Sequence, residues 1–267
     1  FDLERSEILC RAGEAIGLVI ERKGHYRLTR KGAVLIGLPG VTALIEHHKI
    51  LYQDLLNPVG FFKGVEETQL SKFWPYVFGG GMDLKSSEVE KYSDLMSESQ
   101  HLVAADTLAA VNIPSVCRFL DVGGGKGTFV SELKKIHPKV DAAVFDLPGS
   151  HSENSGHRCI IGSFKEDELP AGYDIISLVR ILYDHRDETI RDLLSKTYSA
   201  LDKGGRLIVS EPMLGADRPT LWGDVYFAMY TLAMSTGKTR SPDQVSGFIK
   251  DAGFSNVTIH KLSLIHI

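Results

Sequence analysis

Apolar positions in the first part of the chain repeat with helical spacing. They do so over residues 3–19, where Gly17 supplies a stop, and this pattern predicts one helix. In residues 19–32 the period shortens, and two β-favouring segments flank Lys23 and Gly24, which is typical of a hairpin. A helix followed by a hairpin has the outline of a winged helix. Further helices are expected over residues 41–56, 61–78 and 85–112, with a break in the GGGMD loop at 79–83.

From residue 116 the pattern becomes an alternation of short apolar runs and amphipathic segments. Ser241 as an N-cap and Pro242 at the first helical position mark the start of the last helix. Repeated strand and helix units with apolar strands predict an α/β fold, with a doubly wound, mostly parallel sheet that is covered by helices on both faces and binds ligands beyond the carboxyl ends of its strands. Two domains are expected, residues 1–112 and 113–267. The expected strands are 116–122, 140–146, 158–162, 173–179, 205–211 and 257–260, and the expected helices are 127–137, 187–201 and 241–253.

The composition is that of an ordinary globular protein. Hydrophobic residues make up 43% and charged residues 24% of the 267 positions, and the net charge of −4 is too balanced for a polyanion binder that works by bulk charge. Cys10, Cys117 and Cys159 form no CxxC pair, which disfavours a disulfide framework or a cysteine zinc site and favours a reducing cytoplasm. No apolar run approaches the roughly 18 residues of a membrane span, and FDLERSEILC has no signal-peptide features. Because the chain begins inside a helix without Met and ends inside an apolar run, we expect further residues at both ends.

A glycine-rich motif joins the first of these strands to a helix. In FLDVGGGKGTF, Asp121 is followed by Gly123, Gly125 and Gly127. A dinucleotide fingerprint would need a glycine where Thr128 stands, and a P-loop would need Ser or Thr where Gly127 stands, so a phosphate cradle is disfavoured. Glycines let the backbone approach a bulky ligand closely, and the following helix N-terminus favours a negative group such as a carboxylate.

A second acidic residue supports a ligand site at this edge of the sheet. Asp146 ends the next strand, 19 residues after Gly127. A carboxylate at this position is suited to accept hydrogen bonds from both hydroxyls of a ribose. The alternative is a flexible loop and a solvated strand end. A strand, a glycine motif, a helix and an acidic strand end in this order favour the binding site.

These residues and several later segments resemble class I S-adenosylmethionine-dependent methyltransferases, and within that class the small-molecule O-methyltransferases that include hydroxyindole and plant phenol enzymes. The resemblance covers essentially the whole chain and rests on FLDVGGGKGTF, AVFDLPG, IIGSF, SLVRILYDHRDE, GGRLIVSEPML and YTLAMSTGKTRSPDQVSGFIKDAGF, which occur in family order. VRILYDH and the last segment are most similar to bacterial enzymes that methylate carotenoid pigments, with bipyrrole methyltransferases of red-pigment pathways as the alternative. The resemblance implies a Rossmann-like sheet, an N-terminal winged-helix-like dimerisation domain and a homodimer. It also implies S-adenosylmethionine as cofactor, S-adenosylhomocysteine as product, and an apolar hydroxylated small molecule as substrate.

The resemblance further implies which residues hold the cofactor. The glycine motif would lie along the methionine part, Asp146 on the ribose, and Ser163 with Phe164 beside the adenine, although most relatives have an acidic residue where Ser163 stands. Arg180 matches an arginine that lies beside the cofactor in relatives, whereas a lone arginine after a strand is more often a surface ion-pair partner. The expected set is Asp121, Gly123, Gly124, Gly125, Asp146, Leu147, Ser163, Phe164 and Arg180.

Methylation of a hydroxyl requires alignment, exclusion of water and loss of a proton. Family members commonly use the His of a His-Asp-Trp run as the base, and Tyr183, Asp184 and His185 occupy that run here. One interpretation makes His185 the base, since histidine has an ordinary pKa of about 6.5. The other gives the work to Tyr183 or a water oriented by Glu211, although tyrosine, with a pKa of about 10, is a poor base at neutral pH. A helix-start histidine without a catalytic role is equally compatible with the spacing.

An acceptor pocket is expected from the segment YFAMYTLAM, which resembles the family segment that walls the pocket. Apolar residues at helical spacing are more often ordinary core, so the group carries more weight than its members. The candidates are Met96, Trp222, Phe227, Met229, Tyr230 and Met234.

Two functions outside this class compete with it. A DNA-binding regulator is suggested by five Lys or Arg among the ten residues 22–31, but residues 2–19 carry four acidic and two basic side chains, which is unfavourable for phosphates. A nicotinamide oxidoreductase is disfavoured by the glycine spacing. No metal site is expected, because His47 and His48 have no third ligand at suitable spacing. We therefore expect a small-molecule substrate and no nucleic acid.

Overall fold

The computed structural model describes residues 2–37, 39–65, 67–73, 86–148, 150 and 156–262. The chain divides into two compact units, Phe1–Lys49 and Ile50–Ile267. The boundary expected between residues 112 and 113 falls inside the second unit, between its long helix and its sheet. The division at this boundary into a dimerisation part and a cofactor-binding part remains a prediction.

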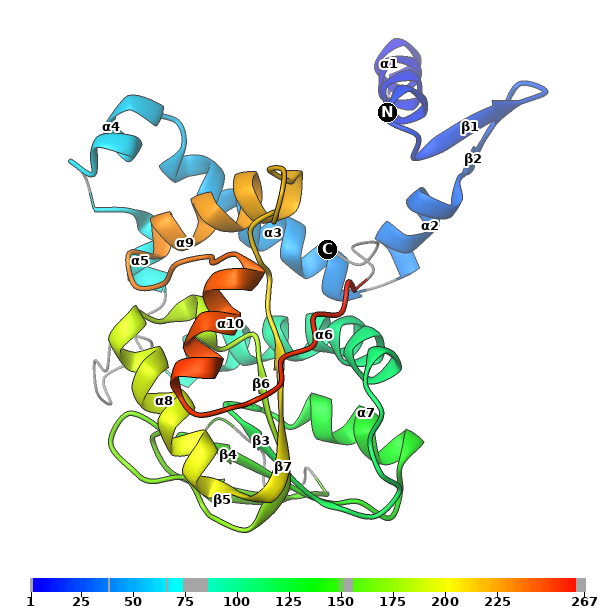
Figure 1. The fold of residues 1–267 in the computed structure, drawn as a ribbon. Coiled ribbons are helices and arrows are strands. Elements are labelled where there is room, and N and C mark those ends of the chain that lie inside the picture. Colours follow the sequence, from blue (N-terminus) through cyan, green and yellow to red (C-terminus); the bar gives the residue numbers. More distant parts are fainter. Residues whose placement is uncertain are drawn as a thin grey trace. The chain divides into compact units, whose positions relative to one another are not determined.

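The first unit begins with a helix and a hairpin. Asp2 caps the helix by accepting a hydrogen bond from the backbone N–H of Arg5 at 3.2 Å. The two strands pair antiparallel, and Lys23 and Gly24 connect them with φ of 54° and 75°, the positive values that a tight type I′ hairpin turn requires. The expected helix and hairpin are confirmed. The elements are α1 (Leu3–Ala15), β1 (Val19–Arg22), β2 (His25–Leu28), α2 (Arg30–Gly37) and α3 (Pro39–Asp54), the last of which continues into the second unit (Figure 1).

A single helix was expected over residues 61–78. This prediction was wrong within the described residues, where two short helices are found instead. They are α4 (Pro58–Lys63) and α5 (Gln69–Phe73). Gly64 ends α4 with a left-handed φ of 62°. The Asp54 carboxylate accepts hydrogen bonds from the backbone N–H groups of Gln69 at 2.6 Å and Leu70 at 3.0 Å, and this cap starts α5.

Five parallel strands form the sheet of the second unit, in the order β5-β4-β3-β6-β7. This confirms the expected α/β class. The strand expected at 257–260 was wrong: Val257 packs against the core, but Ile259 is 55% exposed and no strand of the described chain pairs with this segment. An apolar alternation makes a strand only where another strand supplies hydrogen bonds. The strands are β3 (Arg118–Val122), β4 (Asp141–Asp146), β5 (Arg158–Ile161), β6 (Tyr173–Val179) and β7 (Leu201–Ser210).

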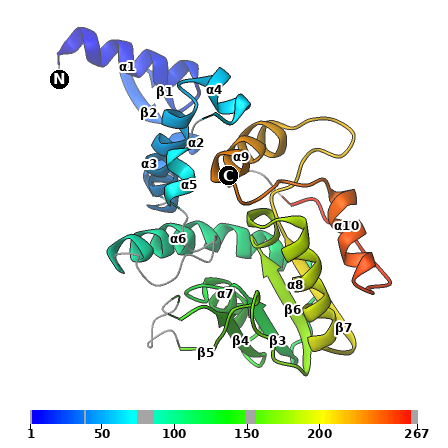
Figure 2. The same ribbon diagram turned by 90° about the vertical axis from the view of Figure 1, so that its left-hand side faces the viewer.

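Helices cover both faces of this sheet, as Figures 1 and 2 show. On β3, Phe119 packs into one apolar cluster with Phe129, and Leu120 packs into the other with Ile190, because successive side chains of a strand point to opposite faces. A capping box between Ser241 and Gln244 begins the last helix, as expected. One face carries α6 (Ser86–Ala110) and α7 (Thr128–Ile136), and the other carries α8 (Asp187–Ala200) and α10 (Pro242–Asp251).

The strand order reverses between β3 and β6, which are neighbours although two strands separate them in the sequence. Such a switch point opens a crevice at the carboxyl ends of the strands. The loops there include a short turn, η2 (Leu182–Asp184), and the pair η3 (Leu221–Phe227) and α9 (Ala228–Met234) follow β7. In the part of the chain that is described, no helix combines the length and the apolar character needed to cross a membrane.

Candidate cofactor and acceptor site

The glycine loop after β3 has a conformation that side chains would disturb. Gly123, Gly125 and Gly127 have φ of 72°, 55° and 77°, in the left-handed region that glycine adopts at no steric cost. A Cβ on Gly123 would lie 2.3 Å from Cδ1 of Ile181, and one on Gly127 would lie 1.8 Å from Nε2 of His157. A Cβ on Gly125 would meet nothing within 4 Å, so this glycine borders open space. The loop therefore packs closely against the protein on one side and leaves its middle accessible to a ligand.

Asp146, at the end of β4, holds this loop in place. Its Oδ2 accepts a hydrogen bond from the backbone N–H of Gly125 at 2.6 Å, and its Oδ1 accepts one from Leu147 at 2.6 Å. Each carboxylate oxygen can accept more than one hydrogen bond. The two strand ends expected to share a ligand are thus linked directly.

Asp121 lies beneath the loop and is 1% exposed. Its Oδ1 accepts a hydrogen bond from the Ser177 hydroxyl at 2.6 Å, and its Oδ2 is buried without a hydrogen-bond partner among the described residues. A Cβ on Gly124 would lie 2.4 Å from that oxygen. Burial raises the pKa of Asp121 to about 7, with a contribution from the neighbouring Asp146 and against the hydrogen bond from Ser177.

Ser163 and Phe164 follow β5, next to the end of β4. Ile161 pairs with Asp146, and the Gly162 N–H donates to the Asp146 carbonyl at 3.0 Å. The expected adenine residues therefore lie beside the expected ribose residue. Phe164 is half-buried against the core, and its carbonyl accepts a hydrogen bond from Lys196 at 2.9 Å.

Arg180 follows β6 at the switch point and has a positive φ of 60°, which is uncommon for a residue with a side chain. Its Nη1 donates to the Ser99 hydroxyl at 2.8 Å and to Oε1 of Gln100 at 3.4 Å. The long helix α6 thus contributes polar groups to this edge of the sheet. Sequence reasoning missed Ser99 and Gln100, because nothing in the local pattern distinguishes them from other polar residues of a helix.

The turn after Arg180 is held by Glu211. Its Oε1 accepts hydrogen bonds from the backbone N–H groups of Ile181 at 2.8 Å and Leu182 at 2.7 Å, and its Oε2 accepts a longer one from Tyr183 at 3.4 Å. Burial raises the pKa of Glu211 to about 7, although these hydrogen bonds and Arg180 favour the ionised form. Glu211 therefore acts on the backbone of the segment that carries the expected base.

Tyr183 and Asp184 are buried in this turn. The Tyr183 ring lies edge-on to Phe227, with centroids 6.1 Å apart. Burial raises the pKa of the Tyr183 phenol, so it stays protonated at neutral pH. Burial and the nearby Glu211 raise the pKa of Asp184 well above its ordinary value, whereas Arg180 and a hydrogen bond with Tyr183 lower it. The carboxyl groups of Asp184 and Glu211 thus both interact with Arg180. Because a single positive charge serves two carboxyl groups, the pair retains a proton at a higher pH than an isolated carboxyl would.

His185 lies in a different environment from Tyr183. Its imidazole meets the ring of Phe164 edge-on, with centroids 5.3 Å apart. Burial, together with the positive charges of Lys165 and Arg240, lowers its pKa to about 4, so His185 is neutral at physiological pH. The two candidate bases therefore have different aromatic neighbours.

The expected acceptor wall is brought only partly to this turn. Phe227 is beside Tyr183, and the ring of Tyr226, which sequence reasoning did not select, lies 4.7 Å from that of Phe227. Tyr230 and Met234 are buried in a separate apolar cluster with α3, α4 and α5. Trp222 is 39% exposed and Met229 is half-buried. The side chain of Met96 lies outside the described residues.

Together, the parallel sheet, the glycine loop after β3 and the acidic end of β4 define the class of the Rossmann-like S-adenosylmethionine-dependent methyltransferases. CalO1, a methyltransferase in calicheamicin biosynthesis solved with S-adenosylhomocysteine bound, has the same fold, with a TM-score of 0.80 and 20% identity over 98% of this chain and 81% of that one. Residues 52–255 match the O-methyltransferase domain. The chain therefore belongs to the O-methyltransferase family, as its motifs indicated.

Two curated relatives are considerably more similar in sequence. The demethylspheroidene O-methyltransferase of Rhodobacter capsulatus is 44% identical over 259 residues, covering 96% of this chain and 66% of the relative. That of Cereibacter sphaeroides is 42% identical over 267 residues, covering 96% of this chain and 70% of the relative. The chain thus spans about two thirds of the length of these relatives.

Proposed function

We propose that this chain transfers a methyl group from S-adenosylmethionine to a hydroxyl group of a carotenoid-like pigment precursor. The observation that carries the proposal is the identity of 44% and 42%, over 96% of the chain, to two enzymes named for demethylspheroidene. A hydroxy-bipyrrole or another aromatic acceptor is the less favoured alternative. A DNA-binding role has no support from these relatives.

The residues at the switch point fit the cofactor. A Cβ on Gly123, Gly124 or Gly127 would collide with Ile181, Asp121 or His157, so the loop needs bare backbone to keep this shape, and Gly125 leaves its middle open to a ligand. Gly123, Gly124 and Gly125 would lie along the methionine part, with Asp121 beneath them. Asp146 would accept hydrogen bonds from the ribose, Leu147, Ser163 and Phe164 would border the adenine, and Arg180 would lie beside the cofactor.

The bound cofactor supplies a methyl group that is already activated on a sulfonium. The protein therefore has to align the acceptor oxygen, exclude water and accept a proton. We assign the acceptor side to Tyr183, because it is buried beside Phe227 in the segment expected to wall the pocket. Its protonated phenol suits hydrogen bonding to the acceptor oxygen rather than taking its proton.

Asp184 is the proton acceptor that this geometry supports best. Only its ionised form can accept a proton, and the hydrogen bond with Tyr183 and the charge of Arg180 favour that form against the effect of burial. His185 is the second candidate, since its neutral imidazole can accept a proton, although a pKa of about 4 makes it a weak base. Glu211 would position both by fixing the backbone of the turn.

Binding and turnover test this proposal in sequence. We expect calorimetric titration to detect S-adenosylhomocysteine binding but no NADH binding. A hydroxylated carotenoid in detergent micelles should then gain the mass of one methyl group, and the matching carotenoid without the hydroxyl should gain none. Binding without transfer to any hydroxylated carotenoid would refute the acceptor class, and transfer to a phenol or hydroxy-bipyrrole instead would establish the alternative.

A homodimer formed through the N-terminal part of the chain, residues 1–112, belongs to the same proposal. It is supported by α1, which has no buried residue and exposes Leu3, Ile8 and Leu9, with Ile16 exposed at its C-cap. Cys10, Cys117 and Cys159 form no disulfide with one another in the described structure, which fits a role in a reducing compartment such as the cytoplasm. Sedimentation equilibrium should give twice the chain mass, and the mass of one chain would refute the dimer.

A further inference from the structure

Arg240 is a buried arginine that none of the cofactor or acceptor assignments uses. It stands just before α10 and is 3% exposed. A guanidinium removed from water is costly unless its donors are satisfied, and Arg240 satisfies them almost entirely within the protein. Its partners show what this burial achieves.

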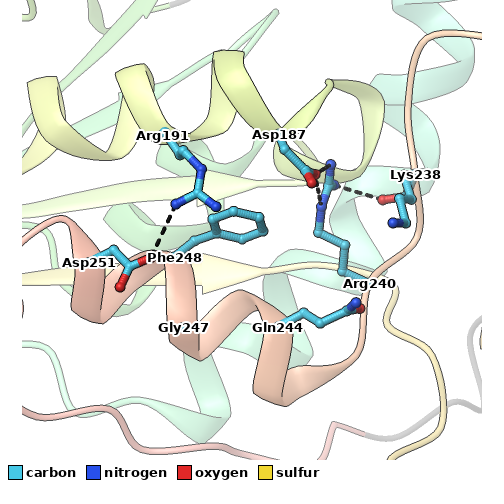
Figure 3. A pocket seen from close by; sticks show the side chains of 8 residues that line it. All are labelled: Asp187, Arg191, Lys238, Arg240, Gln244, Gly247, Phe248 and Asp251. Carbon is cyan, nitrogen blue, oxygen red and sulfur yellow. Dashed lines mark hydrogen bonds and ion pairs between the residues drawn. The ribbon is translucent and has the colours of Figure 1, made fainter.

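The guanidinium connects the base-bearing turn to α8. Its Nε and Nη2 donate to Oδ1 of Asp187 at 3.0 and 2.6 Å. Its Nη2 also donates to the carbonyl of His185 at 2.9 Å, and its Nη1 donates to the carbonyl of Leu182 at 3.2 Å and of Lys238 at 2.8 Å. Figure 3 shows the guanidinium facing Asp187 from across the gap between α8 and α10. One side chain thus binds carbonyls on both sides of Tyr183 and Asp184.

The residues before Arg240 lie directly on the same turn. The Lys238 N–H donates to the Tyr183 carbonyl at 2.9 Å. A Cβ on Gly237 would lie 2.0 Å from that carbonyl oxygen and 2.9 Å from Cα of Asp184, so only glycine allows this approach. Residues 237–240 are therefore fitted to the backbone of the turn.

Glu211 holds the opposite polar groups of the turn. It accepts the N–H groups of Ile181 and Leu182, whereas Arg240 and Lys238 occupy the carbonyls of Leu182, Tyr183 and His185. The backbone is thus bound by an anion on its donor side and by a cation on its acceptor side. A turn fixed in this way presents its side chains in one position.

We propose that Arg240 is a positioning residue for methyl transfer, and that it acts by fixing the backbone of residues 182–185 so that Tyr183 and Asp184 meet the acceptor correctly. The inference rests on the proposed function for its catalytic consequence. Misplacing a reacting group by about 1 Å can cost about 100-fold in rate. Loss of the clamp should therefore reduce turnover more than binding.

Arg191 provides a matched control. It also comes from the α8–α10 interface, lines the same cavity of about 230 Å³, and lies over the ring of Phe248 at 4.6 Å, as Arg240 does at 5.7 Å. Its ion pair is with Asp251 at 3.1 Å, and both of these side chains are more than half exposed. Figure 3 shows the two arginines on either side of Phe248. No hydrogen bond between Arg191 and the turn is found in the described structure.

The test compares Arg240→Gln, Arg240→Lys and Arg191→Gln in the full chain. Hydrogen exchange read by mass spectrometry follows the amides of residues 181–185, with the β3 peptide as an internal reference. We expect Arg240→Gln to speed exchange in 181–185 by about tenfold or more without affecting β3. Its kcat should fall by about 10- to 100-fold, while acceptor KM and S-adenosylhomocysteine affinity change less than about threefold. Arg240→Lys should recover part of both effects, and Arg191→Gln should show neither.

Several results would overturn the proposal. Exchange and kcat in Arg240→Gln equal to those in Arg191→Gln would show that the clamp has no effect. Faster exchange throughout β3, with cofactor affinity and kcat lost in parallel, would make Arg240 a general stabiliser. Should Arg240→Gln fail to fold, Arg240→Lys carries the same comparison. Absence of methyl transfer by the unmodified chain would refute the proposed function, whereas the exchange data would still decide whether Arg240 fixes the turn.

Discussion

The imidazole of His185 and the ring of Phe164, the residue expected beside the adenine, meet edge-on with centroids 5.3 Å apart. Tyr183, from the same turn, instead meets Phe227 at 6.1 Å. Two side chains of one turn, separated by Asp184, therefore have different aromatic neighbours. Because these neighbours differ, we expect substitutions of His185 and Tyr183 to have different effects on binding and turnover.

His185→Ala should weaken S-adenosylhomocysteine binding by about 2- to 10-fold, because the aromatic contact that steadies Phe164 is lost, a contact of about 0.5–1.5 kcal/mol. It should leave kcat within a few-fold of the original value. Calorimetry and steady-state kinetics on the same preparation measure both. If kcat instead fell 100-fold or more at unchanged affinity, an effect of about the size expected for a general base, His185 and not Asp184 would be the proton acceptor.

Tyr183→Phe should show the opposite pattern. The ring and its contact with Phe227 remain, but the hydroxyl that we assign to the acceptor oxygen and to Asp184 is removed. We expect kcat to fall by about 10- to 100-fold with cofactor affinity unchanged. Tyr198→Phe, at a half-exposed tyrosine on α8, is the matched control and should leave kcat unaltered.

Asp146→Ala should raise the dissociation constant of S-adenosylhomocysteine by about 100-fold or more. The carboxylate is expected to accept hydrogen bonds from two ribose hydroxyls. Hydrogen bonds to a charged group contribute about 1.5–3 kcal/mol each. The same change also frees the N–H of Gly125, which loosens the loop. Asp141→Ala, at the exposed first residue of β4, is the control. Equal affinities in the two variants would disprove the ribose assignment.

Sequence periodicity was sufficient for the sheet because its elements depend on local signals. Apolar strands identified β3 to β7, glycine spacing identified the loop before α7, and Ser241 with Pro242 identified the start of α10. Where the outcome depended on a distant partner, local signals were insufficient. The segment 257–260 has strand-like alternation but no strand to pair with in the described chain.

The details of the site depended on such distant contacts. Ser99 reaches Arg180 from a helix 81 residues earlier, and Arg240 reaches Leu182 across 58 residues. Glu211 was expected to orient the base, which stays a prediction, and its hydrogen bonds are to backbone amides of the turn. An arginine in a polar run such as TGKTR looks solvent-exposed in sequence, and only the fold shows that it is buried.

Gly123→Ala should impair both stability and cofactor binding. The new Cβ would lie 2.3 Å from Cδ1 of Ile181, and the φ of 72° costs a residue with a side chain about 1–2 kcal/mol. Adding Ile181→Val removes Cδ1 and should restore part of the loss, leaving the backbone strain. Gly125→Ala, at φ 55° with open space around its Cβ, reports the strain alone. Urea unfolding measures these terms, and identical losses in the single and double variants would show that the contact with Ile181 is unimportant.

Asp121 should make the protein less stable as pH rises. Its folded pKa of about 7 lies above the ordinary value near 4, so the folded state binds a proton that the unfolded state has released between these values. The free energy of unfolding should therefore fall from about pH 4 to about pH 7 and change little above that on account of this group. Asp121→Asn cannot ionise and should make that part of the profile less steep, leaving the contributions of Glu211 and Asp184, whereas Asp141→Asn, at the exposed start of β4, should leave the profile unchanged. Urea unfolding at a series of pH values measures the slope, and an identical decline in Asp121→Asn would show that Asp121 is not the buried acid responsible.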